Sequence, residues 1–364
     1  MRGSGLFLRP RMVRLVQLKH SRQGRRVAVV EGNNLRLLSG ANSIFGLAQA
    51  AIAKKISLAK QIAALPSRES LDYDAVYLGE SEWRLLPAFD HPDEPARCLV
   101  TGTGLTHRKS AENRQAMHSG TGFQPVSAGV EGDRPQANRL EACATSDSLK
   151  MYQWGVEGGR PARGKIGVSP EWFYKGCGTI LRAHGEPLEV PAFALDGGDE
   201  AEVAGAYLID PSGTPRRVGL MLANEFSDHV LEEKNYLYLA HSKLRPCAIG
   251  PELIVDADFR DAHGTTRILR DRTVVWSKPF ATGEKNMCHT VANLEHHHFK
   301  YPAHRRPGDA HVYFFGADAF SFGDGVRLED GDVMEIEVGG FGRALRNPVH
   351  IQRANQKLVK VRPV

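Results

Sequence analysis

The second half of the chain is a succession of short apolar runs with two-residue alternation, and this pattern limits the possible folds more than any other feature. Turn sequences such as "DAHG" and "EDGD" separate the runs. Only two stretches between them, near residues 230–242 and 284–299, have helical spacing. Strands with so few crossover helices favour a mixed or antiparallel β-sandwich or roll over a doubly wound parallel sheet. The runs are "EVPAFAL", "EVAGAYLID", "RRVGLMLANEF", "ELIVDADFR", "TTRILRD", "TVVWS", "HVYFFG" and "VMEIEVGGFGRAL".

The first part of the chain has a different texture. Residues 12–40 contain short strand-like runs, and apolar residues at helical spacing predict one amphipathic helix over residues 43–65. We therefore predict an α+β, mainly β protein, in which a mixed β-sandwich roll carries a small α/β N-terminal domain. The predicted boundaries are a dispensable tail at 1–11, the N-terminal domain at 12–95, a mobile insertion at 119–145 rich in Gly, Pro, Ser, Asn and Gln, and the large β-roll domain at 96–118 and 146–355.

Composition narrows the class of protein. The five cysteines are scattered without a C-x-x-C pair, and no apolar run reaches the roughly 18 residues that a membrane span needs. The net charge of +5 includes three arginines of the N-terminal tail, so no basic surface typical of nucleic-acid binding is indicated. We expect a cytoplasmic protein that binds neither membranes nor nucleic acid.

Two glutamates stand one residue apart at the head of an apolar run. Because side chains alternate along a strand, Glu200 and Glu202 point to the same face and lie side by side. Such carboxylates repel each other unless a cation or a hydrogen-bond donor lies between them. Taken alone, an E-x-E sequence is more typical of a strand face exposed to water.

The residues after this pair change that interpretation. The segment "LANEFSDH" places Asn224, Glu225 and Ser227 after a strand, Lys243 follows, and Gly250-Pro251 opens the next strand. This arrangement resembles the fumarylacetoacetate hydrolase superfamily, whose pattern is E-x-E, a third acid in N-D-x-S, a lysine and a GP strand. Glu225 replaces the usual Asp. The resemblance implies a metal site at Glu200, Glu202 and Glu225. Three carboxylates are typical ligands of a hard cation, Mg²⁺ first, with Mn²⁺ or Ca²⁺ as alternatives.

Further stretches resemble the sugar-acid dehydratases of this superfamily, which act on 2-keto-3-deoxy-pentonates such as 2-dehydro-3-deoxy-D-arabinonate. They are "GTGLTHRKSAENRQAMH", "EWFYKG", "NEFSDH", "NYLYLAHSKLRPCAIGPEL" and "GFGRALRNPV". The resemblance implies a homodimer whose β-roll domain dehydrates a 2-oxo sugar acid to 2,5-dioxopentanoate. Two alternatives remain: an acylpyruvate or diketo-acid hydrolase, and a sugar-acid-binding protein without turnover.

The resemblance also implies roles for single residues. Ser110 and Asn113 fall where hydrolytic members carry a lid histidine and its glutamate, which disfavours hydrolysis. Glu171 supplies a carboxyl group where hydrolases have an apolar residue, and it could take the C3 proton or protonate the leaving C4 hydroxyl. Lys243 is a base at C3 or a fixed cation beside the enolate.

Substrate-binding residues are predicted around this group. They are His107, next to the segment that carries Ser110; Lys175, which could pair with the substrate carboxylate or with Glu171; and Arg343 in "GFGRAL". Ala317 stands where a threonine is common.

A run of histidines at 296–298, with His304, is interpreted as packing and capping groups rather than a zinc site, because consecutive helical positions point in different directions.

Overall fold

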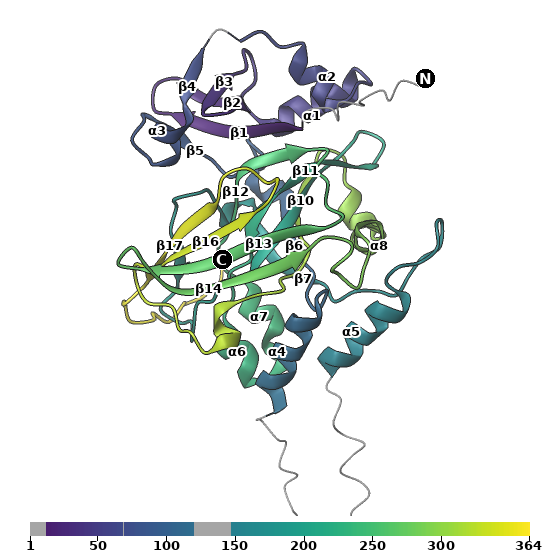
Figure 1. The fold of residues 1–364 in the computed structure, drawn as a ribbon, viewed down its shortest axis with the longest axis vertical. Coiled ribbons are helices and arrows are strands. Elements are labelled where there is room, and N and C mark those ends of the chain that lie inside the picture. The colour runs from purple at the N-terminus through teal and green to yellow at the C-terminus, as the bar shows by residue number, and fades with distance from the viewer. Residues whose placement is uncertain (1–11, 68, 120–146) are drawn as a thin grey trace, which may run out of the picture.

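The protein is mainly β, with two mixed sheets and helices at both ends of the molecule, as the sequence predicted (Figure 1). The computed structural model describes residues 12–67, 69–119 and 147–364. Within these ranges the larger sheet has twelve strands. Their spatial order is β4 (Ser70–Asp72), β3 (Asn34–Leu37), β2 (Gly24–Glu31), β1 (Val13–His20), β12 (Cys247–Val255), β11 (Pro215–Asn224), β10 (Ala201–Ile209), β15 (Ala310–Phe314), β6 (Cys98–Gly102) and β7 (Phe173–Cys177), with β5 (Trp83–Leu85) beside β1 and β8 (Leu181–Arg182) beside β12.

The second sheet comes from the C-terminal half of the chain. It has five strands in the described ranges, ordered β14 (Thr273–Thr282), β13 (Ala262–Arg270), β16 (Val333–Val338), β17 (Leu345–Ile351) and β9 (Leu188–Val190). Most neighbours are antiparallel, while β15 pairs with β6 and β17 pairs with β9 in parallel. Few helices connect these strands, which is why the sheets could not be of the doubly wound type.

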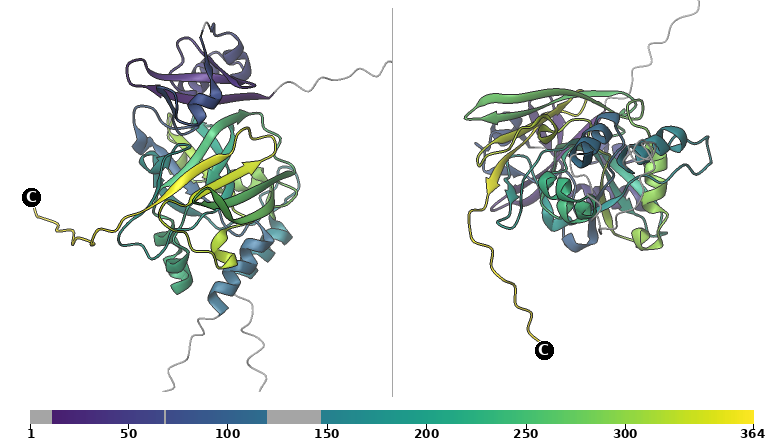
Figure 2. Two further views of the ribbon diagram at one scale, coloured as in Figure 1. Left: turned by 60° about the vertical axis from the view of Figure 1, so that its left-hand side comes forward. Right: turned by 90° about the horizontal axis from the view of Figure 1, so that it is seen from below.

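Most of the helices gather at the two ends of the molecule. In Figures 1 and 2 the first three flank the N-terminal strands, whereas α4 to α7 lie at the opposite end. Their bounds are α1 (Ile44–Ala53), α2 (Leu58–Ala63), α3 (Tyr73–Tyr77), α4 (Arg108–Ser119), α5 (Asp147–Gly158), α6 (His229–Lys234), α7 (Leu239–Lys243) and α8 (Val291–Phe299). Among the described residues, no helix has both the length and the apolar character needed to cross a bilayer.

The central strand β10 is buried on both faces. Its odd-numbered residues, such as Val203 and Tyr207, pack with the second sheet and α8, in a cluster that includes Ile336. Its even-numbered residues, such as Ala204 and Leu208, belong to a second cluster that reaches α1. A side chain on either face of this strand is therefore withdrawn from water.

The single helix predicted over residues 43–65 was wrong in one respect, because the structure has two helices there. Lys55 adopts a positive φ of 54°, which ends the first helix, and the Ser57 side chain then caps α2 by accepting a hydrogen bond from the Lys60 N–H. The N-terminal strands continue the large sheet, since Val13 of β1 pairs with Val255 of β12. The domain boundaries stay predictions, and the tail at 1–11 and all but the first residue of the insertion at 119–145 lie outside the described residues.

Candidate metal centre

The ends of β10 and β11 bring three glutamates together. The register pairs Ala201 with Asn224, so the residues that flank this pair, Glu200 and Glu225, lie opposite each other. The backbone N–H of Glu225 donates to the carbonyl of Glu200 at 3.1 Å, and the Asn224 Oδ1 accepts from the Glu200 N–H at 3.1 Å. With Glu202, one carboxylate oxygen from each glutamate lies within 4.8 Å of the others. Within the described ranges this is the only group of three or more acidic, histidine or cysteine side chains so placed.

These glutamates are not on an exposed strand face, so that interpretation of the E-x-E sequence was wrong. Glu202 is 1% exposed and Glu225 is 0% exposed. The Glu200 side chain is 12% exposed. The reason is the burial of β10 on both faces, which alternation in the sequence does not reveal.

Two lysines and a histidine contact the carboxylates. The Lys243 Nζ, at the end of α7, donates to Glu200 Oε1 at 2.5 Å and to Glu225 Oε2 at 2.6 Å. Lys175 forms a buried ion pair with the other oxygen of Glu225, so of its two predicted partners Glu171 is not the one it contacts, and the substrate carboxylate stays a prediction. The His229 Nε2 lies 3.1 Å from Glu200 Oε1. The cluster is thus a network of buried opposite charges.

The pKa values of the three glutamates are shifted in different directions. Burial alone would raise the pKa of Glu200, but Lys243 and His229 outweigh it and hold the pKa well below its usual value. Burial, with the negative charges of Glu225 and Glu200, raises the pKa of Glu202 well above its usual value. Burial and Glu200 also raise the pKa of Glu225, although Lys175 and Lys243 oppose them. Burial lowers the pKa of Lys243, but Glu200 and Glu225 more than compensate and raise it overall.

The lack of a cationic partner for Glu202 fits the binding of a divalent cation at the glutamate cluster. Glu202 accepts a hydrogen bond from the Gly316 N–H at 2.7 Å, and among the described residues it has no ion-pair partner. Lys243 pairs with Glu200 and Glu225, and Lys175 pairs with Glu225, so Glu202 is the one glutamate of the three whose charged form has no cationic partner among the described residues. All-oxygen donor sets of this kind suit hard cations such as Mg²⁺. The cluster could hold a metal ion at Glu200, Glu202 and Glu225.

A fourth carboxylate, Glu171, lies beside a cavity next to this cluster. Its Oε1 accepts a hydrogen bond from the Arg114 Nη1 of α4 at 2.5 Å, and Arg114 Nε lies 2.7 Å from Glu232 Oε1 of α6. These three residues, with Leu105, Met151 and other side chains, line a cavity of about 200 Å³. Glu200 and Glu232 both favour the charged form of Arg114, so the cavity and the glutamate cluster lie within electrostatic range of each other.

Of the other predicted site residues, His107 directly precedes α4 and Ser110 lies on it, whereas Arg343 lies elsewhere. His107 is buried, its Nδ1 lies 3.0 Å from the Thr106 Oγ1, and burial lowers its pKa to about 4 although Asp318 opposes the shift. Ser110 is half-buried on α4, one helical turn before Arg114.

Arg343 lies in different surroundings. Its guanidinium pairs with Asp74 and stacks over the ring of Tyr73, 4.0 Å from the ring centroid. Its backbone N–H donates to Glu252 at 3.1 Å. These contacts join the β16–β17 turn to α3 and to β12, so we leave Arg343 out of the proposed site.

The histidine run packs against the sheet. The His298 Nε2 lies 3.0 Å from the His311 Nδ1, and the Trp172 Nε1 donates to the His298 Nδ1 at 3.1 Å. His304 contacts the His298 carbonyl at 2.7 Å. The imidazoles bridge α8, β15 and the start of β7.

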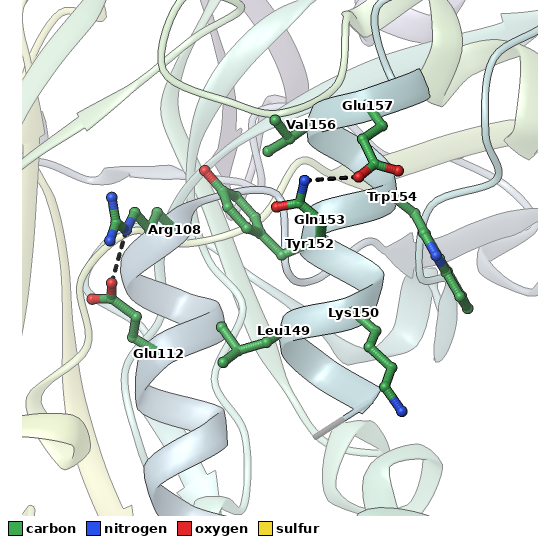
Figure 3. Close-up of a pocket in the computed structure, with 9 residues that line it drawn as sticks. All are labelled: Arg108, Glu112, Leu149, Lys150, Tyr152, Gln153, Trp154, Val156 and Glu157. Atoms are coloured by element: carbon green, nitrogen blue, oxygen red, sulfur yellow. Dashed lines mark hydrogen bonds and ion pairs between the residues drawn. The ribbon is translucent and has the colours of Figure 1, made fainter. Parts of the chain in front are cut away.

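A larger cavity, of about 700 Å³, lies between α4 and α5 (Figure 3). Arg108 and Glu112 line one side of it and form an exposed ion pair at 2.8 Å, while Tyr152 projects from α5. It shares no lining residue with the glutamate cluster, and we do not assign the chemistry to it.

Several site residues were missed by the sequence analysis: Arg114, Glu232, His229 and Ser227 as a donor to Glu225 at 3.2 Å. The spacing of Arg114 four residues after Ser110 on one helix was the available indication, since such residues share a helix face. His229 directly follows the "NEFSD" segment. Nothing local indicated Glu232, which needs the packing of α6 against α4.

Comparison with solved structures identifies the fold. No family model matches the sequence, and no curated protein sequence matches it. The structure is similar to 2-keto-3-deoxy-D-arabinonate dehydratase complexed with magnesium and 2,5-dioxopentanoate, with a TM-score of 0.65 and 18% identity over 94% of this chain and 100% of that one. It is also similar to 5-carboxymethyl-2-hydroxymuconate delta-isomerase from Mycobacterium smegmatis, with a TM-score of 0.54 and 16% identity over 93% of this chain and 100% of that one.

These similarities show the fold. The chain has the α+β fold of the fumarylacetoacetate hydrolase superfamily, as its motifs indicated. Within that fold, it resembles the 2-keto-3-deoxy-D-arabinonate dehydratase branch, which the sequence motifs also suggested.

Proposed function

We propose that this protein is a metal-dependent dehydratase that converts a 2-keto-3-deoxy sugar acid, 2-dehydro-3-deoxy-D-arabinonate, to 2,5-dioxopentanoate. The observation that carries the proposal is the buried cluster of Glu200, Glu202 and Glu225, whose ligand oxygens lie within 4.8 Å of one another. Lys243, Lys175 and His229 contact Glu200 and Glu225, whereas Glu202 has no ion-pair partner among the described residues. The magnesium complex of the structurally similar dehydratase supports the choice of ion and substrate class.

The three glutamates would hold Mg²⁺. When bound, the ion would supply Lewis-acid stabilisation of the negative charge that develops on a 2-oxo acid as its C3 proton is removed. The remaining chemistry belongs to the residues around the cluster.

Glu171 is the proposed proton carrier. One of its carboxylate oxygens is held by Arg114, and the other, Oε2, is buried without a hydrogen-bond partner among the described residues. This free oxygen would take the C3 proton, and the electron pair left on C3 would expel the C4 hydroxyl, which leaves as water with a returned proton. Transfer of a proton from C5 to C3 then gives the C4–C5 enol, which ketonises to the C5 aldehyde.

Lys243 would act as a fixed cation rather than as the base. Glu200 and Glu225 stabilise its ammonium form, which is opposite to what a base at C3 requires. The ammonium would bridge the two carboxylates and stabilise the negative charge on the substrate. Ser110, His107 and Lys175 stay proposed residues of the site.

The test is product formation by the purified protein. With Mg²⁺ and 2-dehydro-3-deoxy-D-arabinonate, we expect 2,5-dioxopentanoate, detected by mass spectrometry after carbonyl derivatisation. EDTA should abolish turnover and added Mg²⁺ should restore it. The matched control is Glu225→Gln, which keeps the shape of the side chain but removes a ligand charge.

The other outcomes each contradict the proposal in a distinct way. Turnover that EDTA leaves unchanged would refute the metal site. Pyruvate among the products would favour the carbon–carbon hydrolase, and tight binding of the acid without any product would favour a binding protein. A cytoplasmic homodimer is also part of the proposal, and a sedimentation mass twice that of the 40.0 kDa chain would support it.

A further inference from the structure

The cavity beside the glutamate cluster contains an arginine held between two carboxylates. The Arg114 side chain is 11% exposed, the Glu171 side chain is 12% exposed, and Glu232 is 3% exposed. Arg114 donates through Nη1 to Glu171 at 2.5 Å and through Nε to Glu232 at 2.7 Å. Because the guanidinium group is planar, fixing Nε on one carboxylate also fixes the direction in which Nη1 points.

The backbone around Glu171 is anchored independently of Arg114. The Thr103 Oγ1 donates to the Glu171 carbonyl at 2.7 Å, and the indole Nε1 of the next residue, Trp172, donates to the His298 Nδ1 at 3.1 Å. The Glu171 carbonyl and the neighbouring Trp172 side chain are thereby both anchored. The direction of the Glu171 carboxylate then depends on its own side-chain rotamer, and Arg114 is the group that holds that rotamer.

The free oxygen of Glu171 lies in a space that a glycine leaves open. A Cβ atom at Gly104 would lie 2.0 Å from Glu171 Oε2 and 3.2 Å from Arg114 Nη2. Oε2 itself is buried and has no hydrogen-bond partner among the described residues. A buried carboxylate oxygen without a partner is costly in a folded protein, so its presence beside a cavity indicates a group kept ready for a ligand.

We propose that Arg114 is a positioning residue, which, oriented by Glu232, holds Glu171 so that Oε2 faces the substrate. This inference rests on the proposed dehydratase function, because it assigns Glu171 the proton transfer. Arg114 itself touches neither the reacting atoms nor the glutamate cluster. Without it, Glu171 could rotate within the cavity and lose its alignment with C3.

The experiment is a double-mutant cycle of Arg114→Gln and Glu171→Gln, assayed with Mg²⁺ and 2-dehydro-3-deoxy-D-arabinonate. Misplacing a reacting group by about 1 Å costs on the order of 100-fold in rate, so Arg114→Gln should lower kcat by about that factor while KM changes little. In the Glu171→Gln background, the same substitution should change kcat by less than about 3-fold, because two residues that act as one unit are not additive.

Several outcomes would overturn the inference. An equal loss of kcat in both backgrounds would show that Arg114 acts independently of Glu171, and an unchanged kcat in Arg114→Gln would show that it positions nothing. A parallel loss of Mg²⁺ affinity would point to collapse of the glutamate cluster instead. If Arg114→Gln does not fold, Arg114→Lys keeps the charge but loses the two-pronged geometry, and it should show the same pattern with a smaller loss of kcat.

Controls separate this inference from the proposed function. Arg108→Gln removes an exposed arginine from the same helix, whose side chain is 79% exposed, and should leave kcat unchanged. Absence of turnover in the wild-type protein refutes the dehydratase proposal itself. A crystal structure of Arg114→Gln gives a readout without activity: the Glu171 carboxylate should leave the position that it has in the wild type, and an unmoved carboxylate would contradict the positioning role.

Discussion

Replacing Glu202 by glutamine should show two separate effects of this carboxylate: the repulsion that it adds to the metal-free protein, and its contribution to Mg²⁺ binding. In the protein without metal, Glu202 is buried, and its pKa is raised well above its usual value by burial and by the charges of Glu225 and Glu200. The amide keeps the size of the side chain and can still accept the hydrogen bond that the Gly316 N–H donates at 2.7 Å. The substitution therefore removes a repulsive charge with little change in packing.

The size of the effect follows from the separation of the carboxylates. Ligand oxygens within 4.8 Å of one another correspond to a repulsion of about 3 kcal/mol per ionised pair at an effective dielectric constant of about 20. Protonation of Glu202 limits this cost in the wild type. We therefore expect Glu202→Gln to raise the free energy of unfolding of the metal-free protein by up to about 3 kcal/mol at neutral pH.

The pH dependence has a definite sign. The usual pKa of the carboxyl group is 4.5, and its folded-state pKa is higher, so above pH 4.5 the folded protein retains a proton that the unfolded chain has released. The metal-free wild type should thus lose stability as pH rises from 4.5 through the raised pKa, by at most about 1.4 kcal/mol per pH unit from this group. Glu202→Gln lacks this pH-dependent loss of stability, so the difference in free energy of unfolding between the variant and the metal-free wild type should grow as pH rises.

The assay is urea unfolding in EDTA and in excess Mg²⁺, with Glu80→Gln, an exposed glutamate, as the control. Ligand at 100 times its dissociation constant stabilises a folded protein by about 2.7 kcal/mol, so the wild type should gain an amount of this order from Mg²⁺. Glu202→Gln should gain far less and should lack turnover. A variant that is less stable than the wild type in EDTA and equally stabilised by Mg²⁺ would refute the charge argument.

Three other perturbations have definite expected results. Lys243→Met leaves two buried carboxylates without their shared cation and should lower the free energy of unfolding in EDTA by about 3 to 5 kcal/mol, measured by urea titration; a loss below about 1 kcal/mol would contradict the buried pairs. Gly104→Ala places a Cβ 2.0 Å from Glu171 Oε2 and should lower kcat by about 100-fold, whereas Gly339→Ala, whose nearest neighbour would be 3.8 Å away, should not. Burial lowers the pKa of His311 to about 3, so below pH 6.5 the unfolded chain binds a proton that the folded protein does not bind. The free energy of unfolding should therefore fall on acidification. If His311→Gln shows the same slope of this free energy against pH as the wild type, this residue does not contribute.

The fold was predictable from the sequence to the extent that local patterns determine it. Alternating runs and turn sequences indicated strands of both sheets, among them β10, β11, β13 and β16, but not the short β4 and β8 or the strand β7. The same patterns contain no information about which strands become neighbours, such as β1 and β12, where Val13 pairs with Val255. Nor do they show that other elements cover both faces of β10. For that reason an exposed face was the simpler interpretation of Glu200 and Glu202 when taken alone.

Helix ends depend on finer detail than periodicity. The apolar spacing over 43–65 runs through Lys55 without interruption, yet the backbone turns there, and Ser57 begins a new helix. Ser57 was the available indication, because serine is a preferred residue at the start of a helix. A cap inside a periodic stretch is easily missed when the apolar residues on both sides continue the same pattern.

The candidate site shows the same division between local and long-range information. Glu225 and Lys243 were found through the resemblance of their motifs, and the pairing of Ala201 with Asn224 explains why one segment brings Glu225 to Glu200. Arg114 was missed because its partners come from a loop and from α6. Arg343 was predicted near the substrate because it lies in a glycine-rich motif, but its guanidinium pairs with Asp74 of the N-terminal segment.

The cost of the buried charges is itself an argument for function. A buried ion pair contributes little to stability compared with apolar residues of the same size, because both ions lose their hydration. The glutamate cluster is less favourable than a simple ion pair, because Glu202 has no ion-pair partner among the described residues. Burial and the charges of Glu225 and Glu200 raise its pKa. Packing against β10 and β11 could be achieved more stably by apolar side chains. Three acids brought together at this point could hold a cation, and the proposal that they bind one is what the Glu202→Gln experiment tests directly.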